Sequence, residues 1–114
     1  NVAEVAVGVG IEVRVEEPNI SPAKFNLHQN YPNPFNPSTN IKFDLAENSN
    51  VSITIFNLVG QKVSTLVNRS LNSGSYTITW NGLDNNANQL PSGMYFYEMR
   101  TPSYQSIKKL VLVK

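Results

Sequence analysis

The sequence predicts an all-β fold, an antiparallel sandwich of about seven short strands with an extra strand at the N-terminus. Apolar residues alternate with polar ones, with a period of two, in one short segment after another. Turn residues, mainly Gly, Asn, Ser and Pro, separate these segments at intervals of roughly 8–12 residues, which is typical of sandwich strands. No window shows the periodicity of a helix.

The longest alternating run lies at the N-terminus, where every second residue from Val5 to Val15 is Val or Ile. It predicts one strand with a single apolar face, and such a strand cannot be stable alone. Two acids and two prolines follow it in Glu16–Pro22, which is typical of a linker. We therefore expect three parts. Residues 1–15 form the last strand of a preceding domain or an added edge strand, 16–24 a linker, and 25–114 the main β domain.

The strands predicted after the linker are Phe25–Leu27, Thr39–Leu45, Val51–Ile55, Lys62–Val67, Tyr76–Trp80, Gly93–Arg100 and Ile107–Val113. In the second of these, Ile41, Phe43 and Leu45 should face the core. Turns are expected at residues 47–50, 57–60 and 72–74, and a long polar loop at 81–92. Trp80 should fill the space between the sheets.

A segment with three prolines, Tyr31–Thr39, precedes the first long strand. Each proline fixes φ near −65°, removes a backbone donor and disfavours helix in the residue before it. This proline leader should therefore be stiff, and neither helix nor central strand. We expect it to guard one sheet edge, because an unprotected edge can pair with another chain.

Composition narrows the classes of function. The 114 residues contain no cysteine, which excludes thiol catalysis, disulfides and Cys-ligated zinc. The formal net charge of +1 does not favour nucleic acid or an anionic membrane as the main partner. No apolar run approaches the roughly 20 residues of a membrane span. Because the sequence starts at Asn1 without a leader, it is expected to be part of a longer or processed protein.

Catalysis and metal binding find little support. His28 is the single histidine, so a Ser-His-Asp site would have to use it, with Asp44, Asp84 or a glutamate to orient it. Asp84–Asn88 has the oxygen spacing that begins a calcium loop. Gln89 and Tyr95 stand where an EF-hand needs Gly and Glu, so a hairpin loop is the default interpretation. We expect no catalytic, cofactor-binding or metal-ligating residues.

Two surface features leave alternatives open. A sugar-binding platform would need several coplanar exposed aromatic rings among Tyr31, Phe35, Trp80, Tyr95, Phe96, Tyr97 and Tyr104. In a small sandwich such rings are more often buried. Lys108 and Lys109 either block pairing at an edge strand or form a basic tag read by a receptor.

Several motifs, taken in order, resemble a known family. They are Tyr31–Thr39, Asn57–Val63, Gly74–Tyr76, Trp80–Gly82, Ser92–Tyr97 and the Lys108–Lys114 end. Together they resemble the type A C-terminal sorting domain of the bacterial type IX secretion system, over about residues 23–114. They are also similar to the immunoglobulin-like domain of flagellar hook-capping proteins.

The resemblance implies an immunoglobulin-like sandwich that acts as a non-enzymatic export signal for an attached cargo. Its implied partners are the type IX secretion machinery, a sortase-like peptidase that cuts the upstream linker, and a cargo domain upstream. The protein would be secreted or placed on the cell surface through the periplasm and outer membrane. Neither nucleic acid nor membrane insertion is implied. A carbohydrate-binding or passive spacer module of a secreted hydrolase is the alternative.

The resemblance also implies recognition residues. They are Pro32, Asn33, Pro34, Phe35, Asn36, Gly60, Gly74, Tyr76, Trp80, Gly93, Tyr95, Lys108 and Lys109. Two positions depart from the family. Asn81 stands where Asp is common, and Ala87 stands where the loop often has Gly, so another turn type is expected there.

Overall fold

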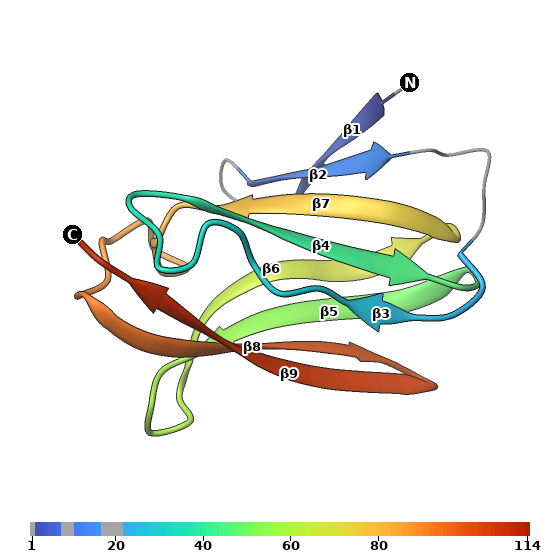
Figure 1. Cartoon of the computed structure of the whole chain (residues 1–114). Coiled ribbons are helices and arrows are strands. Elements are labelled where there is room, and N and C mark those ends of the chain that lie inside the picture. The colour runs from blue at the N-terminus through green and yellow to red at the C-terminus, as the bar shows by residue number, and fades with distance from the viewer. Residues whose placement is uncertain (1, 8–10, 17–21) are drawn as a thin grey trace.

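The computed structural model describes residues 2–7, 11–16 and 22–114, which form two antiparallel sheets packed face to face (Figure 1). The first sheet has the order β1 (Val2–Val7), β2 (Ile11–Glu16), β7 (Gly74–Trp80), β4 (Thr39–Leu45), β3 (Asn26–Leu27). The second has the order β6 (Lys62–Leu71), β5 (Ser49–Phe56), β8 (Gly93–Thr101), β9 (Tyr104–Leu112). The predicted all-β sandwich is confirmed, whereas its immunoglobulin-like topology stays a prediction.

The core lies between the sheets and follows the alternation in the sequence. Ile41, Phe43 and Leu45 in β4 are fully buried, as predicted. The largest fully buried side chains are Trp80 at the end of β7 and Tyr97 in β8. Their burial removes much apolar surface from water, and each aromatic side chain buries about 150–250 Å². The predicted position of Trp80 between the sheets is confirmed.

The N-terminal prediction is wrong in one respect. The alternating run is not one strand but two, because β1 and β2 pair antiparallel with Val5 opposite Val13. The sequence has Gly8 and Gly10 within the run, and glycine weakens a strand interior. β2 then pairs with β7, where Val13 is opposite Ile78 and fully buried. The division of the chain into domains stays a prediction, and the predicted linker lies largely outside the described residues.

Most other boundaries agree with the sequence, with strands somewhat longer than predicted. β6 runs to Leu71, β9 begins at Tyr104, and Ser49 and Asn50 belong to β5 rather than to a turn. These additional residues are mostly polar, so periodicity marked only the apolar half of each strand. No described residue belongs to a helix that could cross a membrane.

Both edges of the second sheet are covered by loops. At β6, the Asn85 backbone N–H donates to the Val63 carbonyl, and the Asn85 side-chain oxygen accepts the Thr65 N–H at 2.9 Å. At β9, the proline leader makes the contacts, as described below. The expectation that the leader guards a sheet edge is confirmed, and the predicted loop 81–92 guards the opposite edge.

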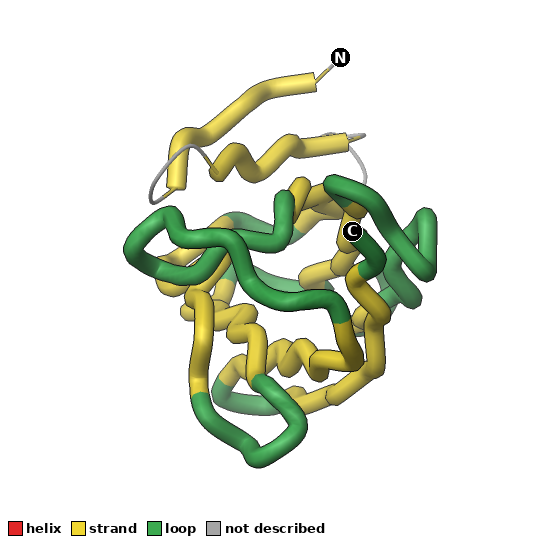
Figure 2. The backbone as a smooth tube through the Cα atoms, turned by 90° about the vertical axis from the view of Figure 1, so that its left-hand side faces the viewer, coloured by secondary structure: helices red, strands yellow, loops and turns green. Residues whose placement is uncertain are grey.

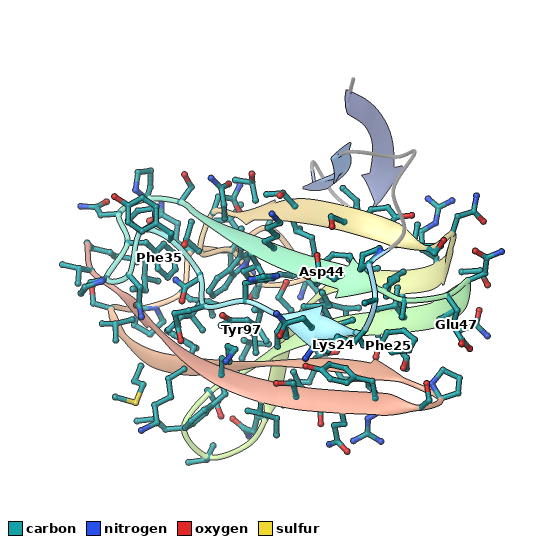
Figure 3. All side chains as sticks on the ribbon, turned by 45° about the vertical axis from the view of Figure 1, so that its right-hand side comes forward. Lys24, Phe25, Phe35, Asp44, Glu47 and Tyr97 are labelled. Carbon is teal, nitrogen blue, oxygen red and sulfur yellow. The ribbon has the colours of Figure 1, made fainter. Side chains whose placement is uncertain are left out.

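The sandwich has two ends of different composition. At one end of the sandwich, β4 and β8 begin and β5, β7 and β9 end. The turn between β5 and β6 lies at the same end. The proline leader and the C-terminus also lie there (Figure 1), and Figure 2 faces this end, with the loops in front of the strands. We call it the motif end. The described residues that follow the linker lie at the opposite end, where Figure 3 labels Lys24 and Phe25 far from Phe35.

Candidate functional site

The proline leader is docked along the last strand. The Phe35 N–H donates to the Val111 carbonyl at 2.9 Å, and the Val113 N–H donates to the Phe35 carbonyl at 3.0 Å. The Asn33 side-chain oxygen accepts the Val111 N–H at 2.9 Å. The leader is neither helix nor central strand, as predicted, and the peptide bonds before its three prolines are cis. Two motifs far apart in the sequence therefore form one surface.

Asn30 anchors the start of the leader in the core. Its side-chain amide donates to the Pro32 carbonyl at 3.2 Å and to the Thr39 hydroxyl oxygen at 3.0 Å. Its backbone N–H donates to the Tyr97 hydroxyl at 2.8 Å, and that hydroxyl donates to the His28 carbonyl at 2.7 Å. A buried polar group needs such partners, because an unpaired one costs about 1–3 kcal/mol. The network holds the leader against β8.

An aromatic cluster lies beneath the leader. The Phe35 ring packs on Trp80 with centroids 5.5 Å apart, and the Trp80 and Tyr95 rings form a T-shaped pair with centroids 6.0 Å apart. The Trp80 indole N–H donates to the Leu83 carbonyl at 3.0 Å. All three rings are buried, so they connect the leader, β7 and β8 rather than presenting a surface.

The two Gly-x-Tyr motifs make the same contact in different strands. At the start of β7, the Tyr76 hydroxyl donates to the Asn72 carbonyl at 2.6 Å. At the start of β8, the Tyr95 hydroxyl donates to the Pro91 carbonyl at 2.6 Å. Each tyrosine hydroxyl thus bonds to the backbone carbonyl of the residue four positions earlier. Burial raises the pKa of both hydroxyls, and these motifs stabilise the entry of the chain into each strand.

The turn at residues 57–60 is held by one asparagine. The Asn57 side-chain oxygen accepts the N–H groups of Val59 at 3.0 Å and Gln61 at 2.9 Å. Its amide donates to the Gln61 side chain at 2.8 Å. Gly60 has φ of 84°, a left-handed conformation that favours glycine. The predicted turn is confirmed, and it is a well-organised one.

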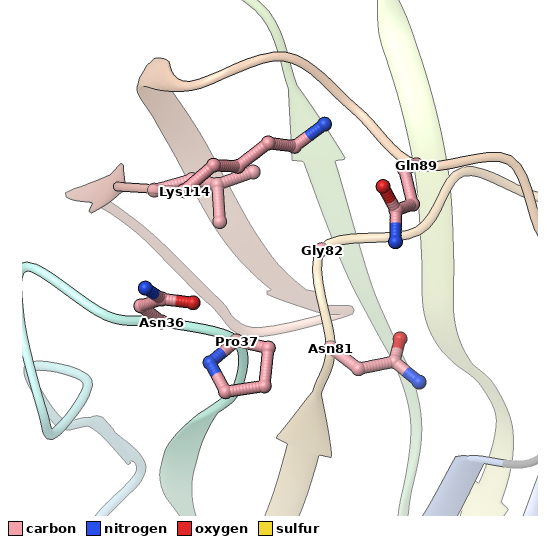
Figure 4. A pocket seen from close by; sticks show the side chains of 7 residues that line it. Asn36, Pro37, Asn81, Gly82, Gln89 and Lys114 are labelled. Atoms are coloured by element: carbon pink, nitrogen blue, oxygen red, sulfur yellow. The ribbon is translucent and has the colours of Figure 1, made fainter.

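A shallow pocket of about 240 Å³ lies where the leader, the Trp80–Gly82 motif and the C-terminal residues meet (Figure 4). Its lining residues are Asn36, Pro37, Asn81, Gly82, Gln89, Leu112 and Lys114. A side chain at Gly82 would meet the Leu112 side chain at 3.3 Å, and φ there is 75°, so the close packing favours glycine. The Lys114 N–H donates to the Ser92 hydroxyl at 2.9 Å, which fixes the end of the chain beside the pocket.

The predicted recognition residues fall into two groups. Phe35, Gly74, Tyr76, Trp80 and Tyr95 are buried and shape the fold. The residues with exposed or partly exposed positions are Pro32, Asn33, Pro34, Asn36, Gly60, Gly93, Lys108 and Lys109. The exposed group lies on the leader, β9, the turn at 57–60 and the first residue of β8. β9 is an edge strand, which fits the first of the two interpretations of Lys108 and Lys109. Whether any of them contacts a receptor stays a prediction.

The histidine does not have the arrangement of a catalytic triad. His28 Nε2 lies 2.9 Å from one Asp44 carboxylate oxygen, and the Ser75 hydroxyl donates to the other at 2.8 Å. The carboxylate therefore lies between the histidine and the serine, whereas a triad places the histidine between them. Asp44 joins β3's end, β4 and β7, which is a structural role.

The Asp84–Asn88 loop uses its carboxylate for internal hydrogen bonds. One Asp84 oxygen accepts the N–H groups of Asn86 and Asn88, each at 2.9 Å. No cluster of three metal-ligating side chains occurs in the part of the chain that the structure describes. Ala87 has φ of 64°, the left-handed conformation that glycine favours; a different turn type at this position stays a prediction.

The aromatic residues do not form the platform that sugar binding would need. Phe35, Trp80, Tyr95 and Tyr97 are buried. Tyr104 is half-buried and stacks on Phe25 with centroids 5.8 Å apart, at the opposite end from the leader. Tyr31 is exposed at the motif end, and Phe96 is half-buried in β8.

Sequence reasoning missed several residues that build this end. Asn30 and Tyr97 hold the start of the leader, Leu112 forms a β-bridge with Phe35, and Asn85 contacts the edge of β6. The only local signal was for Asn30, which directly precedes the proline leader as a polar residue able to bond nearby backbone. Tyr97 and Leu112 lie within quoted motifs, but their contacts with the leader, like that of Asn85 with β6, form across the fold, so no local pattern predicts these contacts.

Comparison with known proteins identifies a family over the part of the chain that carries the motifs. The family model described as "Secretion system C-terminal sorting domain" matches residues 29–114. No curated protein matches the chain. The matched region begins one residue before Asn30 and covers the leader, both Gly-x-Tyr motifs and the C-terminal residues.

Two solved structures share the fold. Dimeric latent PorU from Porphyromonas gingivalis superposes with a TM-score of 0.62 at 17% identity, over 95% of this chain and 13% of that chain. PorZ from the same organism, an essential bacterial surface component of its type-IX secretion system, superposes with a TM-score of 0.52 at 14% identity, over 100% of this chain and 17% of that chain. At these identities the likeness is one of fold, and the chain spans a small part of both proteins.

Proposed function

This chain belongs to the family of secretion system C-terminal sorting domains, and we propose that it is a folded sorting signal, which directs an attached cargo protein through the type IX secretion system. The family is a sorting signal, not a catalytic one, and implies a protein that is exported to the cell surface or secreted. The proposed route crosses the periplasm and the outer membrane. The proposed partners are the type IX machinery, a sortase-like peptidase and a cargo domain upstream.

One observation supports this mechanism above others: the proline leader and the described residues that flank the predicted linker, Glu16 and Lys24, lie at opposite ends of the sandwich. The leader, the turn at 57–60 and Lys114 lie at the motif end, whereas Lys24 and Phe25 lie at the other. Strands of seven to nine residues separate them, which is about 25 Å at 3.3 Å per residue. The machinery could therefore hold the motif end while a peptidase cuts within residues 16–24.

The test is export of a reporter fused upstream of residue 1, behind a Sec signal, in a bacterium with a type IX system. We expect the reporter outside the cell, and mass spectrometry should place the cut within residues 16–24. An otherwise identical strain without the type IX system should retain the fusion in its periplasm.

The outcomes separate the alternatives. Retention of the fusion in the periplasm, with its sorting domain shown to be folded, would contradict the proposed sorting function. Equal export of the reporter without residues 1–114 would indicate a passive spacer. A cut outside residues 16–24 would contradict only the proposed cleavage segment.

A further inference from the structure

The turn between β5 and β6 presents two apolar side chains to solvent. Leu58 is 64% exposed and Val59 is 78% exposed. The backbone beneath them is held by Asn57, which pairs with Val59, Gly60 and Gln61 through its backbone and side chain. Polar residues would satisfy such a turn equally well. A rigid turn with apolar side chains is preorganised for contact, because little conformational entropy is lost on binding.

The two side chains continue into an apolar patch on the outer face of the second sheet. Phe56 is paired with Phe96 across β5 and β8, and both are partly exposed. Met94, 39% exposed, is paired with Val111 across β8 and β9. Met94 and Phe96 alternate with the buried Tyr95 and Tyr97, so they point away from the core. Phe56 and Val111 also point outward, because their strand neighbours Ile55, Leu110 and Leu112 are buried. We call Phe56, Leu58, Val59, Met94, Phe96 and Val111 the apolar patch.

Lysines frame this patch. Lys62 is paired with Phe56, and Lys109 is paired with Phe96, so one row across the sheet reads Lys62, Phe56, Phe96, Lys109. Lys62 and Lys109 are exposed and form no ion pair with any described residue. Glu98 follows on the same face of β8, but its carboxylate lies 3.2 Å from the Arg100 guanidinium. The patch is thus apolar in the middle and positive at both sides.

A hollow lies beside the projecting side chains. It has a volume of about 270 Å³ between the turn and the start of β8. Its lining includes Leu58, Val59, Gly93 and Met94. Lipid tails need only an exposed apolar surface, whereas projecting side chains beside a hollow fit a partner of complementary shape. This shape favours a protein over a membrane surface.

We propose that the apolar patch is a docking surface for a protein of the export machinery. The partner would offer an apolar socket for Leu58 and Val59, an apolar side chain for the hollow, and Asp or Glu residues opposite Lys62 and Lys109. Contiguous apolar patches rimmed by polar groups mark such interfaces. The proposal rests on the proposed function, since it names the surface through which the export machinery would recognise the sorting domain.

The test uses the reporter fusion with the double variant Leu58→Asn, Val59→Asn. We expect its exported fraction to fall about tenfold or more, as for loss of a central interface contact. Ile107→Asn is the matched control, because Ile107 is exposed on the same sheet outside the patch; it should be exported normally. The variant Leu58→Met, Val59→Ile should retain export, and Lys62→Glu, Lys109→Glu should lower it. Thermal unfolding of each purified chain confirms that the variants fold.

Each result decides a separate question. Normal export of a folded Leu58→Asn, Val59→Asn variant would overturn the proposed docking surface but would leave the proposed sorting function standing. Failure of the unmodified fusion to be exported would instead contradict the proposed function itself. Sedimentation with phosphatidylglycerol–phosphatidylethanolamine vesicles tests the membrane alternative. Binding of the chain that is lost in the double variant would make the occupant a lipid surface and overturn the protein partner.

Discussion

At the scale of single residues, Tyr97 shows how one polar atom can hold a leader in place. Its ring is fully buried in β8, and its hydroxyl accepts the Asn30 N–H and donates to the His28 carbonyl. Burial raises the pKa of Tyr97 to about 12, although the bond from the Asn30 backbone acts in the opposite direction. The neutral hydroxyl is therefore the form that the fold requires.

Tyr97→Phe should lower the free energy of unfolding by about 1–3 kcal/mol, because the buried Asn30 N–H loses its acceptor. Tyr31→Phe, at an exposed position, should leave it unchanged. Since the pKa of Tyr97 is higher in the folded chain than its ordinary 10.0, its contribution is complete below pH 10 and declines as pH rises toward 12. Denaturant titrations across this range measure both effects. The same decline in the Phe variant would contradict the assignment to Tyr97.

At the scale of elements, an asparagine side chain covers part of each edge of the second sheet. Asn33 accepts the Val111 N–H in β9, and Asn85 accepts the Thr65 N–H in β6. Each replaces a backbone carbonyl of a missing neighbouring strand. An uncovered edge exposes a row of donors and acceptors to other chains, so these contacts disfavour edge-to-edge pairing at the positions they cover.

Asn33→Ala should accelerate hydrogen exchange of the Val111 amide about fivefold, because one hydrogen bond contributes about 1 kcal/mol. Asn33→Asp keeps the accepting oxygen and should preserve the protection. The amide of Thr65, covered by Asn85 at the far edge, serves as the internal reference and should not change. Unchanged exchange at Val111 in the Ala variant would show that the side chain does not cover this edge.

At the scale of the whole molecule, the last seven residues serve the fold as well as any receptor. Leu110 and Leu112 are buried core residues, and Val111 and Val113 pair with Phe35 of the leader. A deletion of residues 108–114 therefore removes part of the core together with any recognition surface. A loss of secretion in this deletion would not separate the two causes.

We expect the chain without residues 108–114 to lose its cooperative thermal unfolding, as followed by circular dichroism, because Leu→Ala truncations alone cost about 2–5 kcal/mol each in a core. Lys109→Glu with Lys114→Glu should unfold like the unmodified chain, since both side chains are exposed. A deletion that still unfolds cooperatively would show that these residues are dispensable for folding. These surface variants are the appropriate probes of recognition.

Much of the fold could be predicted because alternation is a local property. Thr39–Leu45 was predicted with its correct bounds, and its inward residues follow from period two alone. The N-terminal hairpin was missed, since periodicity cannot show where a run of valines turns back. β6 and β9 were predicted too short, because the polar residues that extend them become strand only through pairing with neighbours.

The sequence by itself determined that this chain is a β-sandwich, and the order of its motifs determined its family. Only the tertiary structure decided which motif residues are available to a partner. Tyr76, Trp80 and Tyr95 are buried, while Leu58 and Val59 of the Asn57–Val63 motif project from a rigid turn. The physical reason is distance along the chain. Asn33 and Val111 are 78 positions apart and touch only after the sheets have packed, so no local pattern encodes the surface that they form.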